Sequence, residues 1–102
     1  MELEYVKKTL FIRISTINKK IVNKFNYINS LLNKDDIESI VINLNNIKSN
    51  YFLTDSILSL NESIKERRKK LYLVGVNNKD FSLLNSNIEI LSSEYVKYRG
   101  EK

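Results

Sequence analysis

The side chains that most often carry out catalysis are missing from this sequence. It contains no cysteine and no histidine among its 102 residues. The lack of cysteine excludes disulfides and thiolate metal sites, and the lack of histidine removes the commonest general base and zinc ligand. Its two glycines, Gly75 and Gly100, cannot form a glycine-rich phosphate-binding loop. We therefore expect a protein that is not an enzyme and that holds no metal or cofactor.

The carboxylates do not form a recognisable catalytic or metal-binding pair. Such a pair needs two carboxylates that converge across a cleft, and the sequence distributes its acids over many segments. Asp35 and Asp36 are adjacent, but they follow a predicted helix and precede a predicted strand, where acidic turn residues are common. None of the acids considered forms a catalytic or metal-binding set; those considered are Glu2, Glu4, Asp35, Asp36, Asp55, Glu62, Glu66, Asp80, Glu89 and Glu94.

One short segment combines aromatic, apolar and polar residues: Asn50, Tyr51, Phe52, Leu53, Thr54, Asp55 and Ser56. Exposed aromatic side chains often anchor protein interfaces. Tyr51 or Phe52 could therefore face a partner, or one of them could pack into the core together with Leu53. We predict that this segment is a protein-binding site.

The net charge of +5 raises the question of a nucleic-acid partner. Most basic residues are scattered, apart from the run from Lys65 to Lys70. That run ends a predicted helix, where cations complement the helix dipole, and no base-stacking aromatic residues are interleaved with it. We therefore interpret it as a helix end and keep weak nucleic-acid binding as a less favoured alternative.

Hydrophobic periodicity predicts the elements that position these residues. Alternation and short apolar runs indicate strands at 3–6, 9–15, 40–44, 70–76 and 88–91. Helical spacing indicates a helix from an N-cap at Asn18 to Leu32, and a second that starts at Asn50 or Thr54 and ends near Arg68. One or two further helical turns are predicted at 81–84.

This order predicts an α/β sandwich with a four- to five-stranded mixed sheet and helices mainly on one face. We expect one domain over residues 1–102, with 92–102 forming a truncated or poorly ordered C-terminal segment. No apolar run approaches the ~18 residues that span a bilayer, and Met1–Glu4 lacks a signal-peptide pattern. We expect a cytoplasmic protein.

This order of elements resembles the STAS domain family, which includes bacterial anti-sigma-factor antagonists and cytoplasmic modules of sulfate transporters. Three stretches carry the resemblance: 9–15, 34–47 and 64–76. In that family, the central strand leads into an Asp-Ser-x-Gly motif at the start of the second helix, and its serine is a phosphorylation switch. Here the matching positions are Tyr51, Phe52, Leu53 and Thr54, so the hydroxyl of the switch is missing.

The resemblance implies a non-catalytic protein-interaction module of transcription regulation, with an anti-sigma-factor kinase or another regulator as its partner. We expect that it is not switched by serine phosphorylation at the family position. Asp55 and Ser56 form an Asp-Ser pair one helical turn later, which makes Ser56 a candidate phosphorylation site. A cytoplasmic STAS-like accessory subunit of a membrane transporter is the main alternative.

Overall fold

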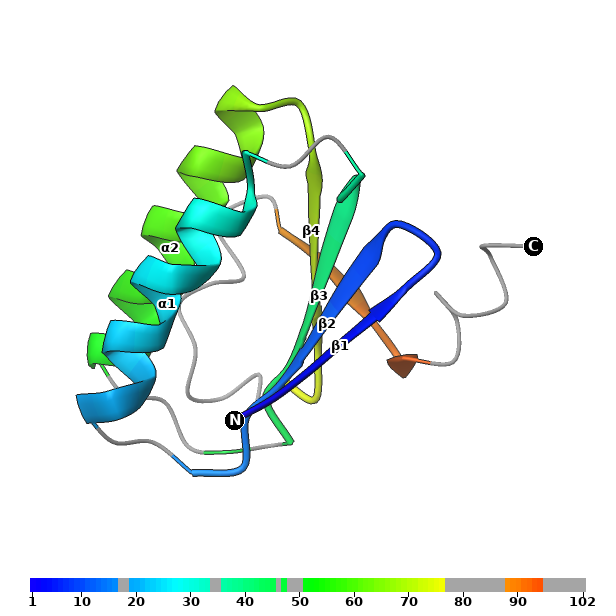
Figure 1. The fold of residues 1–102 in the computed structure, drawn as a ribbon. Coiled ribbons are helices and arrows are strands. Elements are labelled where there is room, and N and C mark those ends of the chain that lie inside the picture. Colours follow the sequence, from blue (N-terminus) through cyan, green and yellow to red (C-terminus); the bar gives the residue numbers. More distant parts are fainter. Residues whose placement is uncertain (17–18, 34–35, 46, 48–50, 77–87, 95–102) are drawn as a thin grey trace.

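The computed structural model describes residues 1–16, 19–33, 36–45, 47, 51–76 and 88–94. The elements are β1 (Glu2–Val6), β2 (Thr9–Arg13), α1 (Lys19–Leu31), β3 (Ser39–Asn43), α2 (Tyr51–Glu66), β4 (Lys70–Val74) and β5 (Glu89–Leu91). The sheet order is β1-β2-β3-β4-β5, with β1 antiparallel to β2 and the other pairs parallel. Figure 1 shows both helices on the same side of this sheet. The predicted mixed α/β sheet is confirmed.

A tight turn joins β1 to β2. Its central residues, Lys7 and Lys8, have φ angles of 45° and 68°. Positive φ at both central residues is typical of the two-residue turns whose twist matches paired antiparallel strands. The backbone oxygen of Lys8 also accepts hydrogen bonds from the amides of Glu38 and Ser39, at 2.8 and 3.3 Å. These two hydrogen bonds therefore join the β1–β2 hairpin to the start of β3.

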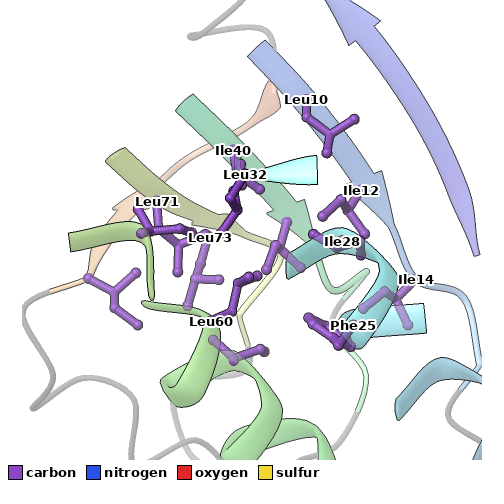
Figure 2. Close-up of a cluster of buried hydrophobic side chains, with 14 of the residues drawn as sticks. Leu10, Ile12, Ile14, Phe25, Ile28, Leu32, Ile40, Leu60, Leu71 and Leu73 are labelled. Atoms are coloured by element: carbon purple, nitrogen blue, oxygen red, sulfur yellow. The ribbon is translucent and has the colours of Figure 1, made fainter. Parts of the chain in front are cut away.

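The main core lies between the sheet and the helices. Alternate strand residues point to this side because side chains of a strand alternate between its two faces. Leu10 and Ile12 of β2 and Ile40 and Ile42 of β3 are all at most 4% exposed. Figure 2 shows side chains from both helices and the three middle strands meeting in this layer.

The opposite face of the sheet is apolar as well. Phe11, Val41, Tyr72 and Val74, from β2, β3 and β4, form a second buried cluster there. Buried parallel strands are commonly apolar on both faces. The two apolar faces of β3 and β4 agree with their place inside the sheet, away from both of its edges.

The basic run at the end of α2 is held by the fold. The amides of Arg68 and Lys69 donate to the carbonyls of Lys65 and Ile64, both at 3.0 Å, and Arg68 has φ 58°. This is the hydrogen-bond pattern of a Schellman C-cap. Arg67 donates to the Ser63 carbonyl at 3.1 Å. These contacts support the interpretation of the run as a helix end.

Most element boundaries differ from the sequence prediction by one or two residues; the second strand, for example, ends at Arg13 rather than at residue 15. The alternative in which Thr54 caps the second helix is wrong, because α2 already begins at Tyr51. The fourth strand ends at Val74 rather than at residue 76, because Gly75 turns the backbone with φ 68°. The predicted cap at Asn18, the turns at 81–84 and most of segment 92–102 lie outside the described residues. Within the described residues, no helix is long and apolar enough to cross a membrane.

Candidate protein-interaction site

The chain that leaves β3 is fixed at the carboxyl edge of the parallel strands. The Oδ1 of Asn43 accepts a hydrogen bond from the backbone amide of Asn45, at 2.9 Å. Asn45, which has φ 51°, donates from its Nδ2 to the Ile14 carbonyl at 2.8 Å. Short polar side chains of this kind commonly stabilise turns by bonding nearby backbone. These hydrogen bonds therefore fix the backbone of the first residues after β3.

Gly75, which follows β4, packs against the same turn. A Cβ at this position would lie 2.8 Å from the Asn45 amide nitrogen and 2.9 Å from the Asn43 Oδ1. The positive φ of Gly75 is in addition a conformation that favours glycine. The turns after β3 and β4 interlock because glycine leaves this space open.

Asn43 also joins an ion-pair network on the second face of the sheet. Its Nδ2 donates to the Glu94 Oε2 at 2.7 Å. Arg13, at the end of β2, donates from Nη2 to the Glu94 Oε1 at 2.7 Å and from Nε to both carboxylate oxygens at 3.0 Å. Arg13 also pairs with Glu2 and Glu4 of β1, at 3.2 and 2.8 Å. Residue 94 is thereby attached to the carboxyl edge of the sheet.

The environment of Glu94 lowers the pKa of its carboxyl group. Burial by itself would raise that pKa, but hydrogen bonds from Arg13 and Asn43 and the positive charge of Arg13 outweigh it. The side chain of Glu94 is only 14% exposed. Glu94 is therefore an ionised structural anchor, and it lies outside the predicted binding segment.

The predicted binding segment forms the start of α2. Its first turn contains Tyr51, Phe52 and Leu53. The side-chain directions of these three residues lie outside what the structure describes, and so does all of Asn50. The free N–H groups of a helix belong to its first turn. Ser56 lies in the second turn and is half-buried, so a phosphate on it would not face those groups.

Asp55 and Ser56 border a hollow between the two helices, which we call the α1/α2 pocket. Its volume is about 200 Å³. Two of its residues, Phe25 of α1 and Leu60 of α2, are buried and belong to the core drawn in Figure 2. The remaining lining residues are polar: Asn26 and Asn29 from α1, and Asp55, Ser56 and Ser59 from α2.

Asn29 gives this pocket an unusual feature. Among the residues that the structure describes, its Oδ1 is the buried side-chain polar atom that has no hydrogen-bond partner. Buried polar atoms in native proteins are nearly always paired, so each exception needs an explanation. A second hollow, of about 390 Å³ between β1 and α1, is lined by Leu3, Tyr27 and neighbours and has no such atom.

The other candidate chemistry does not assemble. Within the described ranges, no group of three or more acidic side chains comes together that could hold a metal ion. The backbone oxygen of Asp36 accepts a hydrogen bond from the Tyr5 hydroxyl at 2.5 Å, so Asp36 lies beside β1. The acids that do gather in the described part of the chain, Glu2, Glu4 and Glu94, are neutralised in part by Arg13. The α1/α2 pocket is therefore the hollow considered further.

Sequence reasoning found one side of this pocket and missed the other. Asp55 and Ser56 belong to the predicted binding segment, whereas Asn26 and Asn29 are not among the predicted site residues. The available signal was the spacing of three residues between Asn26 and Asn29, which places both on one side of a helix. That side could be assigned only once the partner helix was known.

Comparisons with known proteins agree with this architecture. No protein-family model and no curated protein matches the sequence. The mixed five-stranded sheet with two helices is the fold of a STAS domain. A solved serine-to-glutamate variant of Moorella thermoacetica RsbS, a STAS-domain anti-sigma-factor antagonist, matches with TM-score 0.80 and 10% identity, covering 99% of this chain and 97% of that chain. At this identity the likeness is one of fold, and at that level the predicted STAS resemblance is confirmed.

Proposed function

We propose that this chain is a non-catalytic protein-interaction domain of the anti-sigma-factor-antagonist type, acting in transcription regulation in a bacterial cytoplasm. Its partner is a kinase-like anti-sigma factor or a related regulator. One observation carries the proposal. In a chain that shares its fold with RsbS over 99% of its length, the Tyr51–Ser56 segment forms the start of α2, beyond the carboxyl edge of the sheet. Open α/β sheets commonly bind their ligands at this edge.

The binding segment comprises Asn50, Tyr51, Phe52, Leu53, Thr54, Asp55 and Ser56. Its aromatic residues, Tyr51 and Phe52, supply the apolar contact, since aromatic side chains dominate the energetics of interfaces. Asp55 is exposed on the same helix and supplies a charge.

The domain binds its partner without a serine switch at the family position. Phe52 stands there and has no hydroxyl group. Ser56 is the remaining candidate, but it lies in the second turn of α2, away from the first-turn N–H groups that would favour a phosphate. Incubation with the kinase partner and ATP should leave Ser56 unmodified by mass spectrometry. Phosphate on Ser56 would contradict this part of the proposal.

Affinity capture followed by mass spectrometry tests the proposed function. Wild-type protein should recover a regulatory protein, and Tyr51→Ala or Phe52→Ala should reduce the recovery by about tenfold, the effect of losing an interface anchor. Tyr27→Ala is the matched control, because Tyr27 is 58% exposed on α1 and outside the segment. Equal recovery with all variants would refute the assigned surface. Recovery of a membrane transporter would favour the accessory-subunit alternative.

A further inference from the structure

Two residues that line the α1/α2 pocket carry hydrogen-bond acceptors without a partner among the described residues. The Oδ1 of Asn29 is buried and has no partner. The exposed carboxylate of Asp55 lines the same hollow and forms no ion pair with the described residues. A carboxylate accepts hydrogen bonds only, while the hydroxyls of Ser56 and Ser59 can accept as well as donate. The complement of such a pocket is a group rich in donors.

Charge and size narrow the class of ligand. An anion is disfavoured by the carboxylate of Asp55, which lies in a pocket without a lining cation. A tightly held Ca²⁺ or Mg²⁺ usually needs several carboxylate ligands, and the pocket has one. A volume of about 200 Å³ is smaller than the sites that hold drug-sized molecules or cofactors. A single cationic side chain has both the charge and the size that this pocket requires.

The apolar residues of the pocket favour a cation on a hydrocarbon stem. Phe25 and Leu60 are buried, so the inner part of the hollow is apolar and the polar groups lie around it. Arginine carries methylene groups that pack on apolar surface and a planar guanidinium with several fixed donors. Such a head group can bond acceptors on two different helices at once, which a compact ammonium does less well.

We propose that the α1/α2 pocket binds an arginine side chain of the protein partner. Its guanidinium pairs with the Asp55 carboxylate, and its stem packs on Phe25 and Leu60. On binding, the Asn29 side chain rotates and turns its Oδ1, which is closed off from solvent in the free protein, toward the guanidinium. This inference rests on the proposed function, since it names one contact of the same partner. It also accounts for the buried acceptor of Asn29, which becomes paired only in the complex.

The test uses small probes in place of the unidentified partner. N-acetyl-arginine amide is titrated into ¹⁵N-labelled full-length protein, and the side-chain amide signals of Asn26 and Asn29 are followed by NMR. N-acetyl-citrulline amide is the matched probe, because it has nearly the same shape without the charge. We expect saturable shifts with the arginine probe and at least about threefold weaker binding of citrulline, as for loss of an exposed ion pair.

Two variants and a control connect binding to the named groups. Asp55→Asn removes the charge at nearly constant shape and should weaken the arginine probe by at least about threefold. Glu62→Gln removes the same charge from an exposed position on α2 outside the pocket, and should leave the affinity unchanged. If both variants weakened binding of the arginine probe equally, the loss would reflect the net charge of the protein rather than a contact with Asp55, and the proposal would be overturned.

Asn29→Leu separates binding from folding. Leucine has nearly the shape of asparagine and removes the unpaired acceptor, so the free protein should unfold at an equal or higher urea concentration. The same variant should lose binding of the arginine probe. A variant that folds well and still binds the probe with wild-type affinity would overturn the role of Asn29.

The outcomes also separate this inference from the proposed function. If the protein shows no saturable shift with the arginine probe, the pocket assignment is wrong even when a regulator is recovered by affinity capture through Tyr51 and Phe52. If the probe binds as expected but no regulator is recovered, the proposed function fails and the pocket stands.

Discussion

Arg13 and Glu94 are 81 residues apart in sequence, yet the Arg13 Nη2 lies 2.7 Å from the Glu94 Oε1. The Arg13 Nε lies 3.0 Å from both carboxylate oxygens. Both side chains are largely buried, with exposed fractions of 23% and 14%. The pair therefore connects the end of β2 to the described end of the chain, in surroundings where water screens it only in part.

Replacing Glu94 by glutamine should destabilise the fold. The change keeps the shape of the side chain but removes its charge and turns one acceptor into a donor facing Arg13 or Asn43. We expect the free energy of unfolding to fall by about 1–3 kcal/mol, the range for hydrogen bonds to charged groups. Urea denaturation followed by circular dichroism measures it. Glu89→Gln, at an exposed position of β5, is the control and should change stability by less than about 0.5 kcal/mol.

The same carboxyl group makes stability depend on pH. Its pKa is lowered in the folded protein, so its contribution is fully present above the ordinary value of 4.5 and is lost as pH falls through the folded value. Wild-type protein should therefore lose more unfolding free energy than Glu94→Gln between pH 6 and strongly acidic pH. Parallel acid titrations of the two proteins that coincide would show that Glu94 contributes no such dependence.

Arg68→Gly should stabilise the protein. Arg68 occupies the left-handed conformation at the C-cap of α2, with φ 58°, and its side chain is exposed. Glycine adopts that conformation without the steric penalty, which is about 1 kcal/mol for other residues. We expect a gain of about 0.5–1 kcal/mol in thermal or urea unfolding. Arg67→Gly, which removes a hydrogen bond to the Ser63 carbonyl, should instead destabilise.

Gly75→Ala should be strongly destabilising. The residue has φ 68°, and the added Cβ would lie 2.8 Å from the Asn45 amide nitrogen, a backbone atom that cannot rotate away. Strain of this kind costs about 1–3 kcal/mol. Differential scanning calorimetry measures the loss, and Lys70→Ala, at the exposed start of β4, serves as the control. A melting temperature equal to that of wild type would contradict the close approach described for this turn.

The sequence predicts the layers of this fold better than its contacts. Period-two and helical spacing located the strands and helices, because burial acts on each element separately. The antiparallel pairing of β1 and β2 can be predicted as well, because the two residues between them are too few for a parallel crossover. The Arg13–Glu94 pair could not be predicted, because the sequence around either residue does not indicate which distant residue it contacts. The α1/α2 pocket depends on how two helices pack, and helical spacing alone leaves that open.

The position of Asn43 has a thermodynamic consequence. The Oδ1 of its side-chain amide accepts a hydrogen bond from the Asn45 backbone amide just after β3, and its Nδ2 donates a hydrogen bond to Glu94. A displacement of the turn that moved Asn43 would also disturb the carboxylate, so the two regions share a coupling free energy. A ligand that changes the conformation of the turn after β3 would therefore alter amide hydrogen exchange around residue 94. A double-mutant cycle between Asn45 and Glu94 would measure the coupling free energy between the two regions.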